Sequence, residues 1–370
     1  MIQRYTINNF KNHAHSIFEF SNLNILTGIN GMGKSSVMQS MLLLRDSFSR
    51  NQMMDRLFLD GISFKLGGSV ELLNRNVEEE PDKLCLCIDT ENKELNFRYV
   101  YPLVDSSELE IDGENPTIED LKEISLFNDN FQYLSAFRSG PQDFYDSDAS
   151  LVDRHRQVSK NMGAGELAVY YLNKFGNEDI VISELRHLDT VSLSLYSQVE
   201  GWMKEISNGI QLKIDQKDKR IELSFGYERP GRSTTYHRAM NTGYGISFVL
   251  PIIVAILSAK PGALILIENP EAHIHPSGQA ALMRLITLAA EHGVQILIET
   301  HSDHIINGAL VNVKQNNLSK EALAIYYFDH DEELNASPVK LNIGHSGRIQ
   351  DAPKGFFDQM SIDLKVLYGL

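Results

Sequence analysis

Residues 24–36 read NILTGINGMGKSS, an apolar run followed by a glycine-rich loop. The stretch matches the pattern G-x-x-x-x-G-K-[ST], which begins at Gly28 and has its lysine at Lys34. Glycines allow backbone N–H groups to surround phosphate oxygens, while the lysine neutralises charge and the next hydroxyl reaches Mg²⁺. We therefore expect a strand, a loop that binds ATP or GTP with Mg²⁺, and a helix; the alternative is a glycine turn that only caps a helix. The residues expected at the nucleotide are Asn30, Gly31, Gly33, Lys34, Ser35 and Ser36, with Ser35 also a metal ligand.

Composition limits the other possibilities. The 370 residues exceed the usual size of one hydrophobic core, which predicts one large domain with insertions or two domains. A net charge of −15 disfavours a generally DNA-binding surface, because Lys and Arg contacts to phosphate dominate such binding. No apolar run is long enough to cross a bilayer, and the N-terminus lacks the apolar core of a signal peptide. Cys85 and Cys87 alternate on a predicted strand, a poor geometry for a local disulfide, so we expect a reduced, cytoplasmic protein without membrane contact.

Periodicity predicts an α/β fold. From residue 241 onward short apolar strands alternate with helical segments, which indicates a largely parallel sheet covered on both faces. The predicted strands are 4–9, 16–20, 23–27, 83–89, 95–101, 131–137, 210–215, 220–225, 263–268, 294–299 and 323–328. The predicted helices are 34–47, 165–174, 180–207, 246–258, 276–292 and 301–312.

A second constellation is GALILIENPEAHIHP, residues 262–276. Its apolar strand ends in Glu268, at the sheet edge where P-loop proteins place the acid that holds Mg²⁺. Glu271 follows on the turn, and His273 and His275 form an H-x-H pair. A separate metal site at this pair would need ligands from elsewhere in the chain.

A third constellation is ILIETHSDHIINGAL, residues 296–310, where another apolar strand delivers Thr300 and His301 to the same edge. A histidine there can reach a γ-phosphate or an attacking water, as a sensor or proton carrier. The alternative is a helix capped by Thr300 or Ser302 beside solvent-facing histidines.

A fourth constellation is NTGYGISFVLPII, residues 241–253. Gly243, Gly245 and Ser247 stand at the start of an apolar helix, which makes a second N-terminus that attracts anions. One nucleotide does not need two such sites from one subunit. The second is useful if it contacts the nucleotide of a partner, so we expect a homodimer or a higher oligomer.

Together these stretches resemble the ABC-type ATPase heads of the SMC, RecF and OLD group. GINGMGKSS looks like their Walker A form, TINNFKNH their first strand and turn, and NTGYGISFVLP a variant signature motif. IENPEAHIHP resembles their Walker B motif and D-loop, and ETHSDHIIN their switch-histidine segment. The tail LNIGHSGRIQDAPKGFFDQM is similar to a short C-terminal module of a bacterial branch of ATPases linked with mobile-element defence.

The resemblance implies a head that dimerises face to face around two ATP molecules, with Gly245 and Ser247 of one copy at the nucleotide of the other. It implies catalytic roles for Glu268, Glu271 and His301, with Glu268 also a metal ligand. It divides the chain into an N-terminal half of the ATPase lobe with Walker A and a β subdomain (1–115), a helical lobe or insertion (116–240), the part with signature, Walker B and switch histidine (241–330) and a C-terminal module (331–370).

The same resemblance implies a regulatory ATPase that controls a separately encoded effector, such as a nuclease, in antiphage defence. A RecF-like DNA-repair clamp, for which DNA would be a partner, and a non-hydrolysing scaffold assembled by ATP are the competing interpretations. No nuclease or TOPRIM module is recognisable in the sequence, so we expect any nuclease to be a separate polypeptide.

The sequence departs from the family pattern at the catalytic carboxylate. Related heads carry Asp-Glu-Pro-Glu where this chain has Glu268-Asn269-Pro270-Glu271. Asparagine cannot accept a proton from water, and loss of a general base typically costs about 10²–10⁴-fold in rate. We therefore expect slow hydrolysis, with Glu268 or Glu271 as the remaining base.

Four further residues have open assignments. Arg138 is either a phosphate or dimer contact or one side of a structural salt bridge. Lys11 and Asn12 border the adenine by resemblance or form a turn. Gln132 is a candidate for the glutamine that senses Mg²⁺ between the lobes.

Overall fold

The fold is described from a computed structural model, in which all residues are described except 75, 78–80, 218–219, 229–230, 232–233, 345, 354, 358 and 369–370. Its helices are α1 (Lys34–Arg50), α2 (Ile118–Lys122), α3 (Ala168–Phe175), α4 (Leu195–Ile206), α5 (Tyr244–Leu257), α6 (Pro276–Glu291), α7 (Asp303–Lys314) and α8 (Gln359–Tyr368). Its strands are β1 (Ile2–Phe10), β2 (His13–Glu19), β3 (Leu23–Gly28), β4 (Arg56–Phe58), β5 (Lys83–Thr90), β6 (Glu94–Val100), β7 (Glu108–Ile111), β8 (Phe131–Leu134), β9 (Ile210–Lys217), β10 (Arg220–Tyr227), β11 (Tyr236–Arg238), β12 (Leu264–Glu268), β13 (Gln295–Glu299), β14 (Leu323–His330), β15 (Ala336–Lys340), β16 (Asn342–Ile343) and β17 (Ile349–Gln350).

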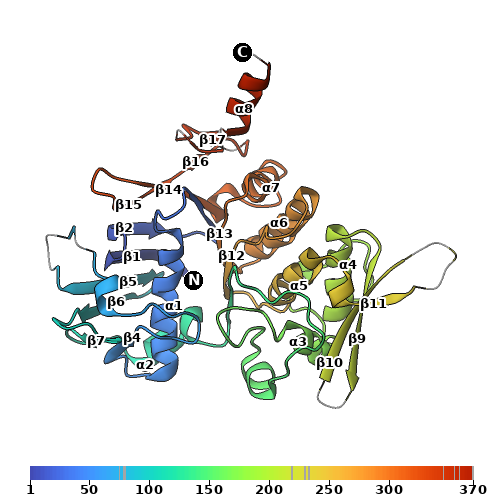
Figure 1. Ribbon diagram of the computed structural model, residues 1–370, viewed down its shortest axis with the longest axis horizontal. Coiled ribbons are helices and arrows are strands. Elements are labelled where there is room, and N and C mark those ends of the chain that lie inside the picture. Colours follow the sequence, from blue (N-terminus) through green and yellow to red (C-terminus); the bar gives the residue numbers. More distant parts are fainter. Residues whose placement is uncertain are drawn as a thin grey trace.

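A central sheet with strand order β15-β14-β3-β13-β12-β8 organises the molecule (Figure 1). Strands β3, β8, β12, β13 and β14 run parallel, and β15 pairs antiparallel to β14. The predicted parallel α/β sheet is therefore confirmed. Because parallel strands end at one edge, the segments that follow β3, β8, β12 and β13 meet there.

Alternation along the central strands feeds two separate cores. On β12, Leu264 and Leu266 join a core with α1 and the N-terminal sheet, whereas Ile265 and Ile267 join the core with α5, α6 and α7. Strand side chains alternate between faces, so apolar residues at every position are required when both faces are covered. This arrangement explains the uninterrupted run of apolar residues in the sequence.

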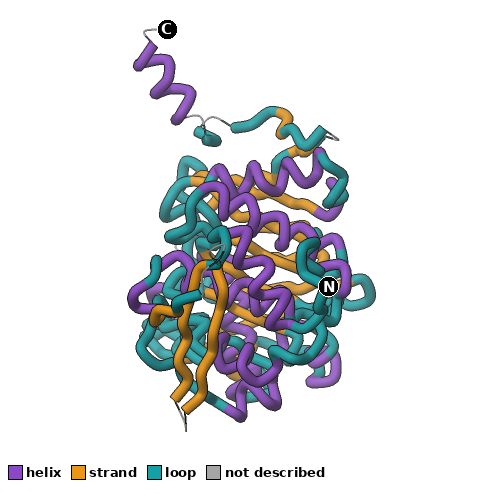
Figure 2. Tube along the Cα trace, turned by 90° about the vertical axis from the view of Figure 1, so that its right-hand side faces the viewer, coloured by secondary structure: helices purple, strands orange, loops and turns teal. Residues whose placement is uncertain are grey.

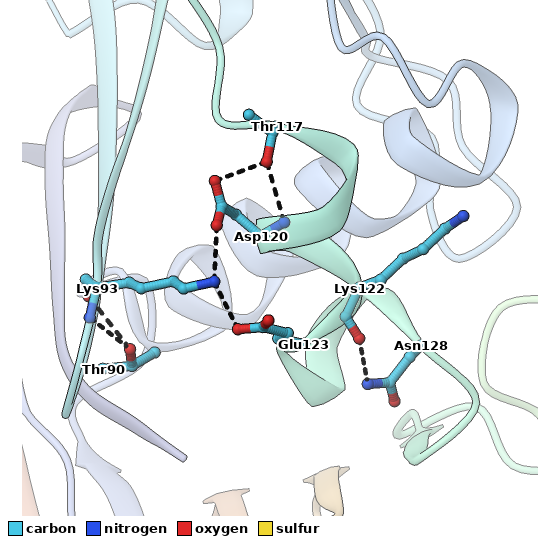
Figure 3. Close-up of polar contacts among 7 residues, drawn as sticks. All are labelled: Thr90, Lys93, Thr117, Asp120, Lys122, Glu123 and Asn128. Atoms are coloured by element: carbon cyan, nitrogen blue, oxygen red, sulfur yellow. Dashed lines mark hydrogen bonds and ion pairs between the residues drawn. The ribbon is translucent and has the colours of Figure 1, made fainter.

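A second, antiparallel sheet with order β2-β1-β5-β6-β7-β4 covers the α1 side. Its β5–β6 hairpin is pinned to α2 by the Lys93 ammonium, which donates to Asp120 Oδ1 at 2.6 Å and to Glu123 Oε2 at 2.5 Å (Figure 3). Thr117 caps α2 by accepting from the Asp120 N–H at 3.2 Å. Residues 118–127 thus pack with the N-terminal sheet, and β8, which follows them, belongs to the central sheet.

The helical lobe contains α3, α4 and the small sheet β11-β10-β9, whose β9–β10 hairpin lies in front of the helices in Figure 2. The predicted helix 180–207 forms only at α4, so its first half was wrong. Ser192 and the other polar residues before α4 explain the difference, because Ser192 Oγ accepts from the Ser194 N–H and its carbonyl accepts from Gln198 Nε2. Such local side-chain bonds compete with helix formation.

The remaining features are the position of α8, the described part of the C-terminal module and the apolar character of the helices. Helix α8 projects from the end of the molecule beyond β16 and β17 (Figure 1 and Figure 2). Five residues of the predicted C-terminal module 331–370 lie outside the described residues. Among the helices that are described, none has the length and apolar character needed to span a membrane.

Candidate functional site

The loop after β3 requires glycine at two positions. Gly28 has φ 128°, and a Cβ added there would lie 2.3 Å from the Phe328 carbonyl oxygen. Gly33 has φ 92°, and a Cβ there would lie 2.8 Å from His13 Nε2. L-residues rarely adopt these backbone angles, so the glycines fix both the turn and its close packing. The strand, glycine loop and helix are arranged as the phosphate-binding mechanism needs.

The turn between β1 and β2 holds this loop from outside. Asn12 Nδ2 donates to the Gly31 carbonyl at 2.8 Å, and His13 Nε2 lies 2.9 Å from the Gly33 carbonyl. His13 is fully buried, and burial lowers its pKa to about 4. The neutral ring therefore donates from Nε2 to the carbonyl, which leaves Nδ1 to accept from Ser16 Oγ at 2.8 Å. Sequence analysis left Asn12 open and missed His13.

Lys34 lies inside the loop. Its Nζ donates to the Gly28 carbonyl at 3.0 Å and to the Ile29 carbonyl at 2.5 Å. Burial lowers the pKa of this ammonium, and the nearby Glu299 carboxylate opposes that shift. At the tip, Asn30 and Gly31 are exposed. In the first turn of α1 Ser36 is buried, and its N–H donates to the Gly33 carbonyl at 3.1 Å.

Two glutamates stand side by side at the sheet edge. Glu268 and Glu299 are partners in the parallel register of β12 and β13, on the face of Leu266 and Leu297, which is the α1 side. Glu268 accepts from the Tyr133 hydroxyl at 2.9 Å and from the Ala136 N–H at 3.1 Å.

Glu299 accepts from Ser35 Oγ at 2.8 Å through Oε1. Burial, reinforced by the Glu268 charge, raises the pKa of Glu299 to about 7, against the opposing effects of Ser35 and Lys34. Sequence analysis missed Glu299, although the strand pattern of 294–299 placed it level with Glu268. Its proximity to Ser35 comes from the sheet order, which sequence analysis did not resolve.

Glu271 fixes the segment that carries His301. Its Oε2 accepts from the Thr300 hydroxyl at 2.8 Å and its Oε1 accepts from the His301 N–H at 2.9 Å. His301 itself is exposed, and partial burial together with the Lys34 charge lowers its pKa. The structure thus brings His301 into the electrostatic field of the loop. Both carboxylate oxygens of Glu271 are occupied, which makes it a support for this segment.

Arg138 is a buried clamp that forms no salt bridge within the described residues. Its guanidinium donates to the carbonyls of Glu268 at 2.6 Å and Asn269 at 2.7 Å. It also donates to Ser135 O at 2.6 Å and, from Nε, to Phe248 O at 3.2 Å on α5. Arg138 therefore joins the Walker B turn to the helix of the signature-like segment.

The start of α5 is open to solvent, but Ser247 is not. Gly243 is the N-cap, and no atom of the described part of the chain lies within 4 Å of a Cβ built on it. Gly245 packs against the D-loop, since its Cβ would lie 2.2 Å from the His273 carbonyl. Ser247 is 4% exposed, because the helix period turns it inward. The expected contact of Ser247 with a partner's nucleotide does not fit this position.

Three other assignments take structural roles. Gln132 Nε2 donates to Arg156 O at 2.7 Å and its Oε1 accepts from Val158 N–H at 3.1 Å, so it holds a loop rather than facing Glu268. His275 caps α6 by accepting from the Ser277 N–H at 3.3 Å. Lys11 Nζ donates to Gln39 Oε1 at 2.7 Å on α1.

The site fits a magnesium nucleotide by the chemistry of its groups. A glycine loop with a lysine at a helix N-terminus suits phosphates, and the oxygens of Ser35, Glu268 and Glu299 suit a hard divalent cation. A buried Glu299 oxygen that has no hydrogen-bond donor among the described residues supports the same conclusion.

A family model described as "AAA domain, putative AbiEii toxin, Type IV TA system" matches residues 23–307. The chain belongs to this family. The AAA domain is followed by residues 318–367, which match DUF3696, a family of proteins of unknown function. None of the curated proteins searched matches the chain.

Solved structures similar to the chain include heads of SMC proteins. One is an SMC head bound to the C-winged helix domain of ScpA, at 16% identity and a TM-score of 0.56, over 92% of this chain and 98% of that one. Another is an Smc head with an extended coiled coil bound to the C-terminal domain of ScpA, derived from Pyrococcus furiosus, at 14% identity and a TM-score of 0.53, over 100% of this chain and 98% of that one. The likeness shows the fold, that of an SMC-type ABC-ATPase head.

Proposed function

We propose that this chain is an ATP-gated switch: it binds Mg²⁺ and ATP, pairs face to face with a second copy, hydrolyses ATP slowly and controls a separately encoded effector. The observation that supports binding most is the convergence of Lys34, Ser35 and Glu268 at one sheet edge around a loop that only glycine can form. The bound cation would offset the negative charge of the phosphates at this edge.

Each residue has a task in this proposal. Lys34 leaves the loop carbonyls for the β- and γ-phosphates, and the first N–H groups of α1 bind phosphate oxygens. Ser35 and Glu268 hold the cation. Glu271 positions His301 through Thr300 and the backbone, and His301, neutral because its pKa is lowered, orients a water or senses the γ-phosphate.

Pairing of two copies is supported by the open start of α5. Gly243 and Tyr244 are exposed, and among the described residues no atom lies within 4 Å of a Cβ built on Gly243. A second phosphate-binding helix end has a use when another copy brings its nucleotide to it. ATP would then stabilise the pair because it contacts both copies.

Slow turnover is supported by Asn269 at the position of the general base. Glu271 is occupied by Thr300 and His301, and Glu268 accepts two hydrogen bonds. The role in defence and the separate effector rest on the family description alone. We assign contact with the effector to the segment that matches DUF3696. The nuclease identity of that effector is the least supported part.

The test is size analysis by light scattering with and without Mg²⁺ and ATP, alongside measurement of ATP affinity and phosphate release. Lys34→Ala should lose ATP affinity about a hundredfold or more and stay monomeric. Gly243→Glu, which meets no atom within 4 Å, should bind ATP normally yet fail to pair, because its carboxylate repels the partner's phosphates. Gly243→Ala is the matched control.

Wild type that binds ATP and remains monomeric would remove the pairing from the proposal. Turnover above about 1 s⁻¹ would remove the slow hydrolysis, since that rate is ordinary for enzymes. Strong, salt-sensitive DNA binding by the chain alone would favour the DNA-repair clamp.

A further inference from the structure

Glu299 is a buried carboxylate that the chain leaves half satisfied. The residue is 6% exposed, and its Oε1 accepts from Ser35 Oγ at 2.8 Å. Its Oε2 is buried and has no hydrogen-bond donor in the part of the chain that is described. Buried polar atoms are nearly always paired, and an unpaired buried charge is costly. Such an atom calls for a ligand that compensates it.

The surroundings of Glu299 indicate which ligand that is. Strand β13 lies between β3, which leads into the glycine loop, and β12, which ends at Glu268. Lys34 is the nearby cation that influences Glu299, but its Nζ donates to loop carbonyls at 2.5 and 3.0 Å. Two carboxylates and a hydroxyl therefore converge on one face of the sheet edge. This is a set of hard oxygen ligands, the kind that Mg²⁺ prefers.

We propose that Glu299 is an additional ligand of the divalent cation that accompanies the nucleotide, bound to it directly or through one water beside Ser35 and Glu268. The inference rests on the nucleotide binding proposed above for the same site. Its immediate consequence is a site with two acidic groups next to the phosphates. Without a divalent cation those groups repel ATP, and with one they hold it.

The effect of Mg²⁺ on ATP affinity distinguishes a metal ligand from a residue that only supports the loop. Glu299→Gln keeps an oxygen that accepts from Ser35 and removes the charge. Metal-free ATP should then bind more tightly than to wild type, because one repulsion is gone. ATP with Mg²⁺ should bind more weakly, because a ligand is gone. The factor by which Mg²⁺ raises ATP affinity should fall about 10–100-fold, the usual range for residues that tune a metal site.

The experiment is calorimetric titration of the full chain with ATP in EDTA and in Mg²⁺, and Mn²⁺ binding followed by electron paramagnetic resonance with a non-hydrolysable ATP analogue. The variants are Glu299→Gln, Glu299→Asp and Ser35→Ala. We expect an intermediate effect for Glu299→Asp, and Ser35→Ala serves as the reference for loss of the hydroxyl ligand of the proposed function. Glu291→Gln, exposed at the end of α6, is the control for the same change of net charge.

Wild type without measurable ATP affinity overturns the proposed function itself. Wild type that binds, together with Glu299→Gln showing an unchanged Mg²⁺ factor and unchanged Mn²⁺ affinity, overturns this inference alone. Equal weakening of ATP binding in EDTA and in Mg²⁺ also overturns it, since that result describes a support of the loop. If Glu299→Gln does not fold, Glu299→Asp decides by the same two readouts.

Discussion

The chain contains two glycine-rich helix starts of opposite character. The start of α1 is packed against other segments of the chain. Gly28 lies against a backbone carbonyl, His13 is hydrogen-bonded to the Gly33 carbonyl, and Glu299 accepts a hydrogen bond from Ser35. The start of α5 is open, with space around Gly243 and with Tyr244 58% exposed. The first has Lys34 and two glutamates beside it, whereas the second begins with the exposed residues Gly243 and Tyr244. The first is the candidate nucleotide site, and the second is the exposed helix start to which the proposed function brings a second copy.

The same difference predicts that the two glycine-rich segments tolerate substitution of their glycines to different degrees. Glycine at 28 is imposed by φ 128° and by contact with Phe328, whereas Gly243 has φ −61°, which any residue can adopt. A motif alone does not distinguish these cases. The contacts of a Cβ with its neighbours do.

The largest expected effect is on stability at Gly28. Gly28→Ala combines an unfavourable backbone angle with an overlap against backbone, each worth about 1–3 kcal/mol, so the free energy of unfolding should fall by roughly 3–5 kcal/mol. Gly243→Ala should stay within about 0.5 kcal/mol of wild type. Urea denaturation of both variants checks the contrast. Equal losses would mean that the two helix starts are equally constrained.

The next effect is a pH dependence at the start of α1. His13 has a folded pKa of about 4 against an ordinary 6.5, so between these values the unfolded chain binds more protons than the folded one. Stability therefore falls as pH falls from about 6.5 to 4, by up to about 3 kcal/mol for this group. His13→Gln should flatten that part of the stability profile relative to wild type.

His15→Gln, an exposed position on the same hairpin, is the control. A profile of His13→Gln that runs parallel to wild type over this interval would contradict the neutral, buried histidine. ATP affinity should follow the same pattern in wild type, since His13 holds the Gly33 carbonyl of the loop.

Much of this site could be predicted because its positions follow from strand ends. Glycine spacing, the apolar run before Glu268 and the run before Thr300 each locate the edge of a parallel sheet. The order of the strands could not be predicted from them. That order sets β13 between β3 and β12, which makes Glu299 the partner of Ser35.

Sequence-based assignments failed where particular contacts of the folded chain outweighed the pattern of residue types. The sequence left Arg138 open between a phosphate or dimer contact and a structural salt bridge, whereas carbonyls from three segments surround it. Ser247 follows the glycines in sequence, yet the period of α5 turns it toward the core. The first half of the helix predicted over 180–207 does not form, because serine hydrogen bonds near Ser192 compete with it. Periodicity contains no information on the partners of Arg138 or on the serine hydrogen bonds.

A smaller effect is expected at the link between the two helix starts. Arg138→Lys removes the planar fork that serves four carbonyls, and a lysine has three donors and no fork. We expect a loss of about 2 kcal/mol in the free energy of unfolding, since buried acceptors are left unpaired. ATP-dependent pairing should weaken more than ATP affinity. Arg154→Lys, exposed in the helical lobe, is the control, and equal losses in pairing and affinity would contradict a link.

The smallest expected effect on stability concerns Asn269. Its φ is 43°, an angle that asparagine adopts more readily than glutamate, and its backbone is held by the Glu299 carbonyl and by Arg138. Asn269→Glu should therefore cost about 1 kcal/mol of stability while raising phosphate release about tenfold or more, because a general base is restored. Asn269→Asp adds a shorter carboxylate without the backbone cost. If both variants release phosphate at the wild-type rate, a missing base does not limit turnover, and the slow step lies in the pairing and separation of the two copies.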